Sequence, residues 1–177
     1  MTFYVEKCII TPIGCDVVAW DVFDNITISA KWLKRKTELI EEKKVLIDRK
    51  IATNSDRIAT VFRGGIFDVE LGEGNIGGEK NKTRPAVVVT PDRMNKGNTV
   101  IIIPLSTKFS LGPNGRPLYR NHYLLRKADY PFLDTDSVIK TEDIRSVDVV
   151  RLRNLRGNLN REDMKRLKNS ILFICGY

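Results

Sequence analysis

The spacing of the apolar residues changes near Val61 and divides the chain into two unequal parts. From about Ser29 to Ile58 neither glycine nor proline occurs, and large apolar residues recur at intervals of seven, seven, four and seven positions: Leu33, Ile40, Ile47, Ile51 and Ile58. This spacing predicts a long helix with one apolar stripe, which begins near Asn25 or Thr27. The stripe must pack on the rest of the chain or on a second copy in a short coiled coil.

The first 23 residues have a different pattern from the predicted helix. Residues 3–23 contain short β-branched and aromatic runs that Pro12 and Gly14 interrupt, which predicts one or two short strands or an irregular packed segment. We therefore expect residues 1–62 to form an N-terminal extension of short strands followed by the long helix.

From Arg63 onward the apolar residues alternate with a period of two, or run almost without interruption, as in strands. Six strands are predicted, at 66–71, 85–90, 99–105, 119–125, 137–141 and 148–155. A terminal helix follows, capped by Asn160. Because no helices separate these strands, residues 63–177 are predicted to form a small, mostly antiparallel and partly closed barrel, a mostly β fold with helices in the α+β class. The expected core comprises Val69, Val87, Val89, Ile101, Ile103, Val138, Ile144 and Leu167.

The composition fits one globular core with an appendage. The chain has 177 residues, of which 42% are hydrophobic and 29% charged. Its cysteines, Cys8, Cys15 and Cys175, suit neither a disulfide framework nor a CxxC metal pair. Because the sequence contains neither a membrane-spanning apolar run nor a signal peptide pattern, we expect a cytoplasmic protein without a membrane partner.

The positive charge is concentrated in the second part of the chain. Residues 1–62 carry 10 basic and 9 acidic side chains, whereas residues 63–177 carry 20 basic and 13 acidic ones. An excess of seven positive charges suits a protein that binds a phosphate backbone.

The stretch from Arg63 to Pro85 is the most distinctive segment of the basic part. It reads as a hairpin whose glycine-rich loop, residues 72–82, ends close to Arg84, and the glycines predict a mobile loop. An arginine is always charged near neutral pH, and its planar fork of donors suits a phosphate ligand.

Four sequence blocks occur in an order that resembles the MazF/PemK family of toxin endoribonucleases from type II toxin-antitoxin systems. They are R-G-x-I, G-x-E-x-x-x-x-R-P, V-I-I-I-P-L-S-T and D-S-V-I-K-T-E-D-I-R-S-V-D, and the resemblance covers residues 63–177. It implies an SH3-like barrel that forms a homodimer and cuts single-stranded mRNA at short sequences without a metal or cofactor. The expected products carry a 2′,3′-cyclic phosphate and a 5′-hydroxyl, and a partner antitoxin inhibits the enzyme. Residues 1–62 have no counterpart in the compact members of this family.

The resemblance assigns the catalytic role to Arg84, which falls on the arginine of the R-P motif. This guanidinium would stabilise the charge on phosphorus, because an arginine is a poor general base. Ser106 falls on the family's hydroxyl residue, usually threonine, and Thr107 beside it is the second candidate. A histidine pair is excluded within one chain because His122, expected to be a surface or packing residue, is the only histidine. The carboxylates are too scattered to predict a metal site.

RNA recognition is predicted at two places. The glycine-rich loop supplies Glu79, Lys80 and Lys82, and the K-T-E-D-I-R block supplies residues at positions where family members contact RNA: Lys140, Glu142 and Arg145. Two alternatives remain, a non-catalytic nucleic-acid-binding module and a gyrase-poison-like module that binds a protein. Gyrase poisons of this fold use a C-terminal tryptophan, whereas Trp20 and Trp32 lie near the N-terminus here.

Overall fold

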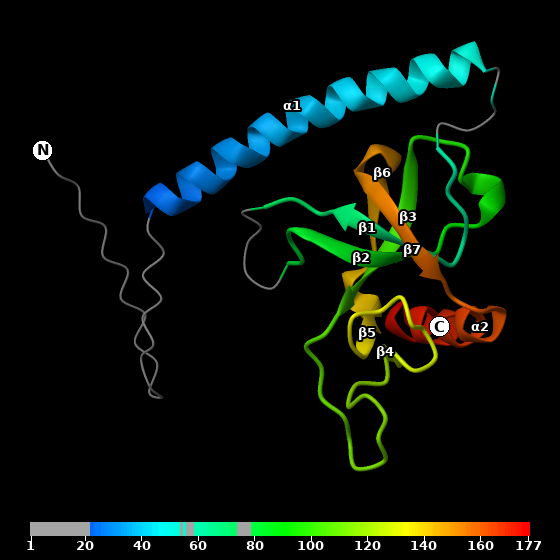
Figure 1. Cartoon of the computed structure of the whole chain (residues 1–177). Coiled ribbons are helices and arrows are strands. Elements are labelled where there is room, and N and C mark those ends of the chain that lie inside the picture. Colours follow the sequence, from blue (N-terminus) through cyan, green and yellow to red (C-terminus); the bar gives the residue numbers. More distant parts are fainter. Residues whose placement is uncertain (1–21, 54, 56–58, 74–78) are drawn as a thin grey trace, which may run out of the picture.

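The computed structural model describes residues 22–53, 55, 59–73 and 79–177. The strands predicted before residue 22, as well as Ile58 and residues 74–78 of the glycine-rich loop, lie outside these ranges. In the described part, one long helix, α1 (Val22–Ala52), precedes a domain of short strands that ends with a second helix, α2 (Arg161–Ile174). Figure 1 shows α1 running along one side of the sheet and α2 lying at the other side.

The strands of the described residues form one antiparallel sheet. Its members are β1 (Gly65–Glu70), β2 (Thr83–Val88), β3 (Thr99–Ser106), β4 (His122–Leu125), β5 (Ser137–Lys140), β6 (Arg145–Asp148) and β7 (Leu152–Asn158). The strand order is β4-β5-β3-β2-β1-β7, and β6 pairs with β3 beside β5. The predicted antiparallel α+β class is confirmed, and the sheet remains open between β4 and β7.

The last predicted strand, 148–155, is wrong because two strands occupy this region. β6 ends at Asp148, a short 3-10 helix, η3 (Val149–Arg151), follows, and β7 begins at Leu152. The Asp148 carboxylate accepts a hydrogen bond from the backbone nitrogen of Val150 at 3.2 Å and so stabilises the turn. The turn sends β6 to the edge of β3 and β7 to the edge of β1.

The core lies on both faces of the sheet. One cluster contains Val69, Ala86, Val88 and Ile102, and parts of α1 pack against it. The other contains Val87, Ile103, Ile139 and Leu167, the last from α2. Of the eight predicted core residues, five are buried, Val89 and Ile144 are partly buried, and Ile101 is 41% exposed. Ile101 faces outward because its neighbours Val100 and Ile102 point into the core and side chains alternate along a strand.

Helix α1 turns a different face to the domain from the one its sequence predicts. Leu33, Ile40 and Ile51 of the predicted stripe are exposed, and Ile47 alone of the described members packs on the core. The face that contacts the domain is instead spaced by three and four residues and includes Trp32, Arg35, Leu39, Glu42 and Leu46. Charged side chains on this face form ion pairs with the strands, so apolar spacing alone pointed to the wrong side. The helix also begins at Val22, before the predicted cap.

Helix α2 agrees with its prediction. The Oδ1 atom of Asn160 accepts a hydrogen bond from the backbone nitrogen of Asp163 at 2.8 Å, which caps the first turn. Leu167 is fully buried in the core. Neither α1 nor α2, nor any other helix in the described ranges, has the length and apolar character needed to span a membrane.

Candidate active site on the face of strands β2 and β3

The strand register brings Arg84 and Ser106 together. β2 and β3 pair at Ala86–Pro104, Val87–Ile103 and Val88–Ile102, so the same register continued by two residues places Arg84 opposite Ser106. Directly opposite residues of antiparallel strands share one face of the sheet. The two predicted catalytic residues, 22 positions apart in sequence, therefore lie side by side on neighbouring strands.

This face is the one over which α1 lies. Arg84 is directly opposite Val69 of β1, and Val69 belongs to the core cluster against which α1 packs. Arg145 is opposite Ile102 of the same cluster. Lys140 lies two residues beyond Val138, which is opposite Ser106, and so shares its face. Four of the predicted site residues thus reach one surface from strands β2, β3, β5 and β6.

Arg84 is half-buried and has its guanidinium held at one side. Its Nε donates a hydrogen bond to the backbone oxygen of Asn81 at 2.7 Å. No carboxylate of the described residues forms an ion pair with it, so a structural ion pair does not explain its presence. Because Nε points to Asn81, the two terminal nitrogens remain as a fork for a bidentate anion.

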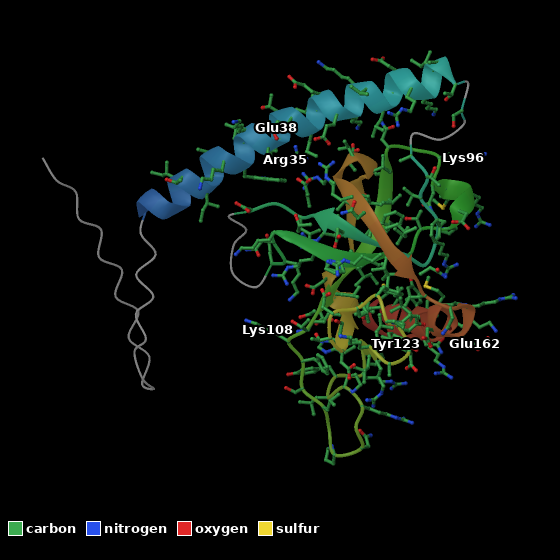
Figure 2. All side chains as sticks on the ribbon, in the orientation of Figure 1. Arg35, Glu38, Lys96, Lys108, Tyr123 and Glu162 are labelled. Carbon is green, nitrogen blue, oxygen red and sulfur yellow. The ribbon has the colours of Figure 1, made fainter. Side chains whose placement is uncertain are left out.

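The two candidate hydroxyls lie in different surroundings. Ser106 is buried, and its Oγ lies 3.3 Å from the backbone nitrogen and 3.4 Å from the backbone oxygen of Lys108. These long hydrogen bonds close the turn that leaves β3, at the place where Figure 2 labels Lys108. Thr107, the next residue, is exposed and lies on the other side of the chain. Ser106 is therefore the hydroxyl that shares a face with Arg84.

The glycine-rich loop returns to the sheet through a strained base. Gly72 has φ +107° and Lys82 has φ +61°, so both lie in the left-handed region, and the Lys82 nitrogen donates to the Gly72 oxygen. Lys82 and Glu79 are exposed. The Lys80 Nζ lies 3.6 Å from Asp143, and Arg145 donates to the Lys80 backbone oxygen at 3.4 Å. The end of the loop thus lies against the K-T-E-D-I-R segment, and the two predicted RNA-binding regions are neighbours.

Glu142 is held by residues that the sequence did not implicate. It lies in a short 3-10 helix, η2 (Thr141–Asp143), and accepts hydrogen bonds from Asn121 at 2.6 Å and from the Nε2 of His122 at 2.8 Å. His122 is buried, and its Nδ1 has no hydrogen-bond partner in the described part of the chain. The sequence offered no signal for this contact because the partners are 20 residues apart and meet only through the pairing of β4 with β5.

The face can orient and charge-stabilise a phosphate. Arg84 and Arg145 supply guanidinium donors, and Lys140 adds a cation. Ser106 adds a hydroxyl that both donates and accepts. Within the described residues, no three His, Cys, Asp or Glu side chains gather as a metal site.

Known proteins share both the sequence and the fold of this domain. Residues 62–174 match the family described as PemK-like, MazF-like toxin of type II toxin-antitoxin system. An endoribonuclease MazF from Staphylococcus saprophyticus is 31% identical over 109 residues, which is 62% of this chain and 86% of that protein.

Two solved structures share the fold at lower sequence identity. A MazF from Deinococcus radiodurans matches with a TM-score of 0.53 at 17% identity, over 67% of this chain and 99% of that one. An endoribonuclease from a Mycobacterial species, solved with its cognate antitoxin, matches with a TM-score of 0.51 at 18% identity, over 66% and 96%. With the family match extending over well more than half of the sequence, the chain belongs to the PemK-like, MazF-like toxins of type II toxin-antitoxin systems.

Proposed function

We propose that this protein is a metal-independent endoribonuclease that cuts single-stranded mRNA at short sequences. The observation that carries the proposal is the pairing of Arg84 and Ser106 on one face, with a guanidinium that no described carboxylate neutralises. The relative from Staphylococcus saprophyticus is named an endoribonuclease, which supports the same class of activity.

The proposed reaction is a transesterification within the RNA. The 2′-oxygen attacks the adjacent phosphorus, its proton leaves, and the bond from phosphorus to the 5′-oxygen breaks. This gives a 2′,3′-cyclic phosphate and a 5′-hydroxyl. Arg84 stabilises the negative charge that builds on the non-bridging oxygens, and Ser106 orients the phosphate or the attacking hydroxyl. Lys140, Glu142 and Arg145 hold the strand beside the cut, together with Glu79, Lys80 and Lys82 from the loop.

The proposal is tested by cleavage of a diverse single-stranded RNA pool in EDTA. We expect cutting by the wild type and a loss of about 10²- to 10³-fold in rate for Arg84→Ala, the usual cost of removing one preorganised donor. Arg93→Ala is the matched control because Arg93 is exposed in a separate short helix, η1 (Asp92–Met94). Ser106→Ala and Thr107→Ala separate the two hydroxyls, and we expect the larger loss for Ser106. Undiminished cutting by Arg84→Ala would refute the site.

Two assembly properties belong to the proposal. We propose that the active form is a homodimer and that an antitoxin protein inhibits it. A relative of this fold was solved with its cognate antitoxin, and a partner with an acidic, partly disordered segment would complement the basic domain. We also propose a boundary near residue 62, with 1–62 as an extension of the toxin domain 63–177. The family match at 62–174 supports this boundary.

A further inference from the structure

A basic pocket lies at the edge of the sheet, outside the face that carries Arg84. It has a volume of about 640 Å³ and lies between the end of the β3–β4 connection, strand β4 and helix α2. This connection, together with β4, forms the part of the domain that is farthest from α1 in Figure 1. Its chemistry is set by six lining residues: Arg116, Tyr119, Arg120, His122, Arg126 and Arg166.

The charge of this pocket is almost unopposed. None of its described lining residues is acidic. Arg116, Arg120 and Arg126 form no ion pair with any described residue, and Arg166 reaches Asp163 only at 4.0 Å. Arg120 packs over the ring of Phe173, 4.8 Å from its centroid, which fixes its position without neutralising it. Four guanidiniums directed to one hollow repel one another unless an anion is bound between them.

The other lining side chains add hydrogen-bonding capacity without adding negative charge. His122 is buried, and its Nδ1 lacks a partner in the described part of the chain, an unusual state for a buried polar atom. Tyr123 also lines the pocket and donates to Asp163 at 2.7 Å, beside α2 as Figure 2 shows. Burial, assisted by this carboxylate, raises the pKa of Tyr123 to about 12, so its phenol stays neutral.

The pocket continues from the candidate active site. His122 on β4 is directly opposite Lys140 on β5, and its Nε2 holds Glu142, so two predicted RNA contacts form the inner border of the pocket. Strands β2, β3, β5 and β4 are successive neighbours, which separates Arg84 from His122 by about 14 Å across the sheet. A single strand of RNA that crosses Arg84 and Lys140 therefore arrives at the arginines.

An exposed aromatic ring favours RNA over an acidic peptide. Tyr119 is 59% exposed, and its ring is tilted against that of His122 with centroids 5.0 Å apart. Aromatic side chains beside arginines are the usual combination for single-stranded nucleic acid, since bases stack on the ring while phosphates bind the cations. An acidic peptide would use the charges but not the ring.

From these observations we infer that the arginine pocket is an accessory subsite that binds phosphates and one base of the RNA strand beyond the cut. This inference rests on the proposed endoribonuclease function and extends it. The subsite would lengthen the RNA footprint outward from Lys140 and Glu142 and would contribute affinity for strands long enough to reach it.

The test uses full-length protein and 2′-O-methyl RNA, which cannot be cut because its attacking oxygens are blocked. Affinity is measured by fluorescence anisotropy for oligonucleotides of about 16 and about 4 nucleotides, the range of sites on small single-strand-binding domains. Arg116→Gln with Arg126→Gln removes two exposed pocket charges, and Arg93→Gln with Arg161→Gln removes two exposed charges elsewhere.

We expect the pocket double variant to bind the long RNA at least about tenfold more weakly than the control double variant. Its salt dependence should be shallower by about 1.4 in log K against log salt, since each lost contact on a single strand removes about 0.7. For the short RNA the two double variants should not differ. Tyr119→Ala should also weaken binding of the long RNA, whereas Tyr119→Phe should retain it, because stacking needs the ring alone.

Equal affinity of both double variants for the long RNA would overturn the subsite. So would a glutamate-rich peptide whose binding, but not that of RNA, depends on Arg116 and Arg126. The result is separable from the proposed function. Pocket-dependent binding without any cutting of cleavable RNA refutes the endoribonuclease and keeps the subsite, whereas cutting without pocket dependence does the reverse.

Discussion

The two helices of this protein are attached to the same sheet by different forces. Helix α2 contributes the fully buried Leu167 to the core and begins at a capped turn. Helix α1 is attached chiefly through charges: Arg35 donates to both carboxylate oxygens of Glu70 at 2.9 Å, and Glu42 accepts from Arg153 at 2.7 Å. Figure 2 shows Arg35 on the side of α1 that faces the strands. Burial is little affected by salt and pH, whereas ion pairs depend on both.

This difference coincides with the limits of the family. Helix α2 ends at Ile174, where the family match also ends, whereas α1 precedes its first residue, 62. A helix that completes the core is part of the folding unit, but a helix held by ion pairs can be an addition to a complete domain. The comparison therefore teaches that α1 is the separable element and α2 is not.

The largest effect expected from this comparison is that of Leu167→Ala. Removing a fully buried leucine leaves a cavity and should cost about 3 kcal/mol of unfolding free energy, measured by urea denaturation of the whole chain. The matched variant is Leu39→Ala, because Leu39 is the buried leucine of α1. It should increase hydrogen exchange in α1 and leave the unfolding of the sheet and α2 nearly unchanged. Equal destabilisation of the sheet by both variants would contradict the comparison.

A smaller effect is expected at Glu70, which joins α1 to the sheet. Its carboxylate receives hydrogen bonds from both Arg35 and Arg153, and its side chain is 15% exposed. Glu70→Gln leaves two half-buried guanidiniums without this charge and should cost the docking of α1 about 2 kcal/mol. The matched control is Glu162→Gln on α2, whose exposed pair with Lys165 should contribute less than about 0.5 kcal/mol. Protection of α1 from hydrogen exchange measures both.

The same carboxylates give the docking of α1 a pH dependence. The hydrogen bond from Arg35, helped by Arg153, lowers the pKa of Glu70 below its ordinary 4.5 in spite of burial. Burial alone would raise the pKa of Glu42, but Arg153 and Arg35 outweigh it and the net shift is downward. A lowered folded-state pKa adds stability that is fully present above the ordinary value and is lost as pH falls through the lowered one. Protection of α1 should therefore be constant from pH 7 to about 5 and fall below about 4, whereas Glu70→Gln should flatten this profile.

Much of the domain could be predicted because its signals are local. Strands β1 to β5 have alternating or continuous apolar residues between turn residues, and Asn160 caps α2 as its position indicates. The pairing of Arg84 with Ser106 is consistent with the order of the sequence blocks, and the strand register supplies the geometry.

The unpredicted features depend on contacts between distant residues. The division of the segment after Arg145 into two strands depends on which neighbour each half pairs with, which the alternating pattern does not specify. The partnership of His122 with Glu142 needs β4 to lie against β5. The docking face of α1 combines Leu39 with charged residues whose partners lie on β1 and β7. A count of apolar residues on a helix misses a face that is held by ion pairs.

The smallest expected effect concerns the apolar stripe that the sequence places on α1. Leu33 and Ile40 are 65% and 59% exposed, so Leu33→Gln with Ile40→Gln should change the unfolding free energy by less than about 0.5 kcal/mol per residue. Trp32→Ala, one position away, should matter more because its ring packs against Gly72 and under the Arg151 guanidinium. Urea denaturation and the mass in solution are the measurements. A large loss of stability, or a change in mass, would mean that a second copy covers this stripe. Helix α1 would then be held by burial after all, and its contrast with α2 would disappear.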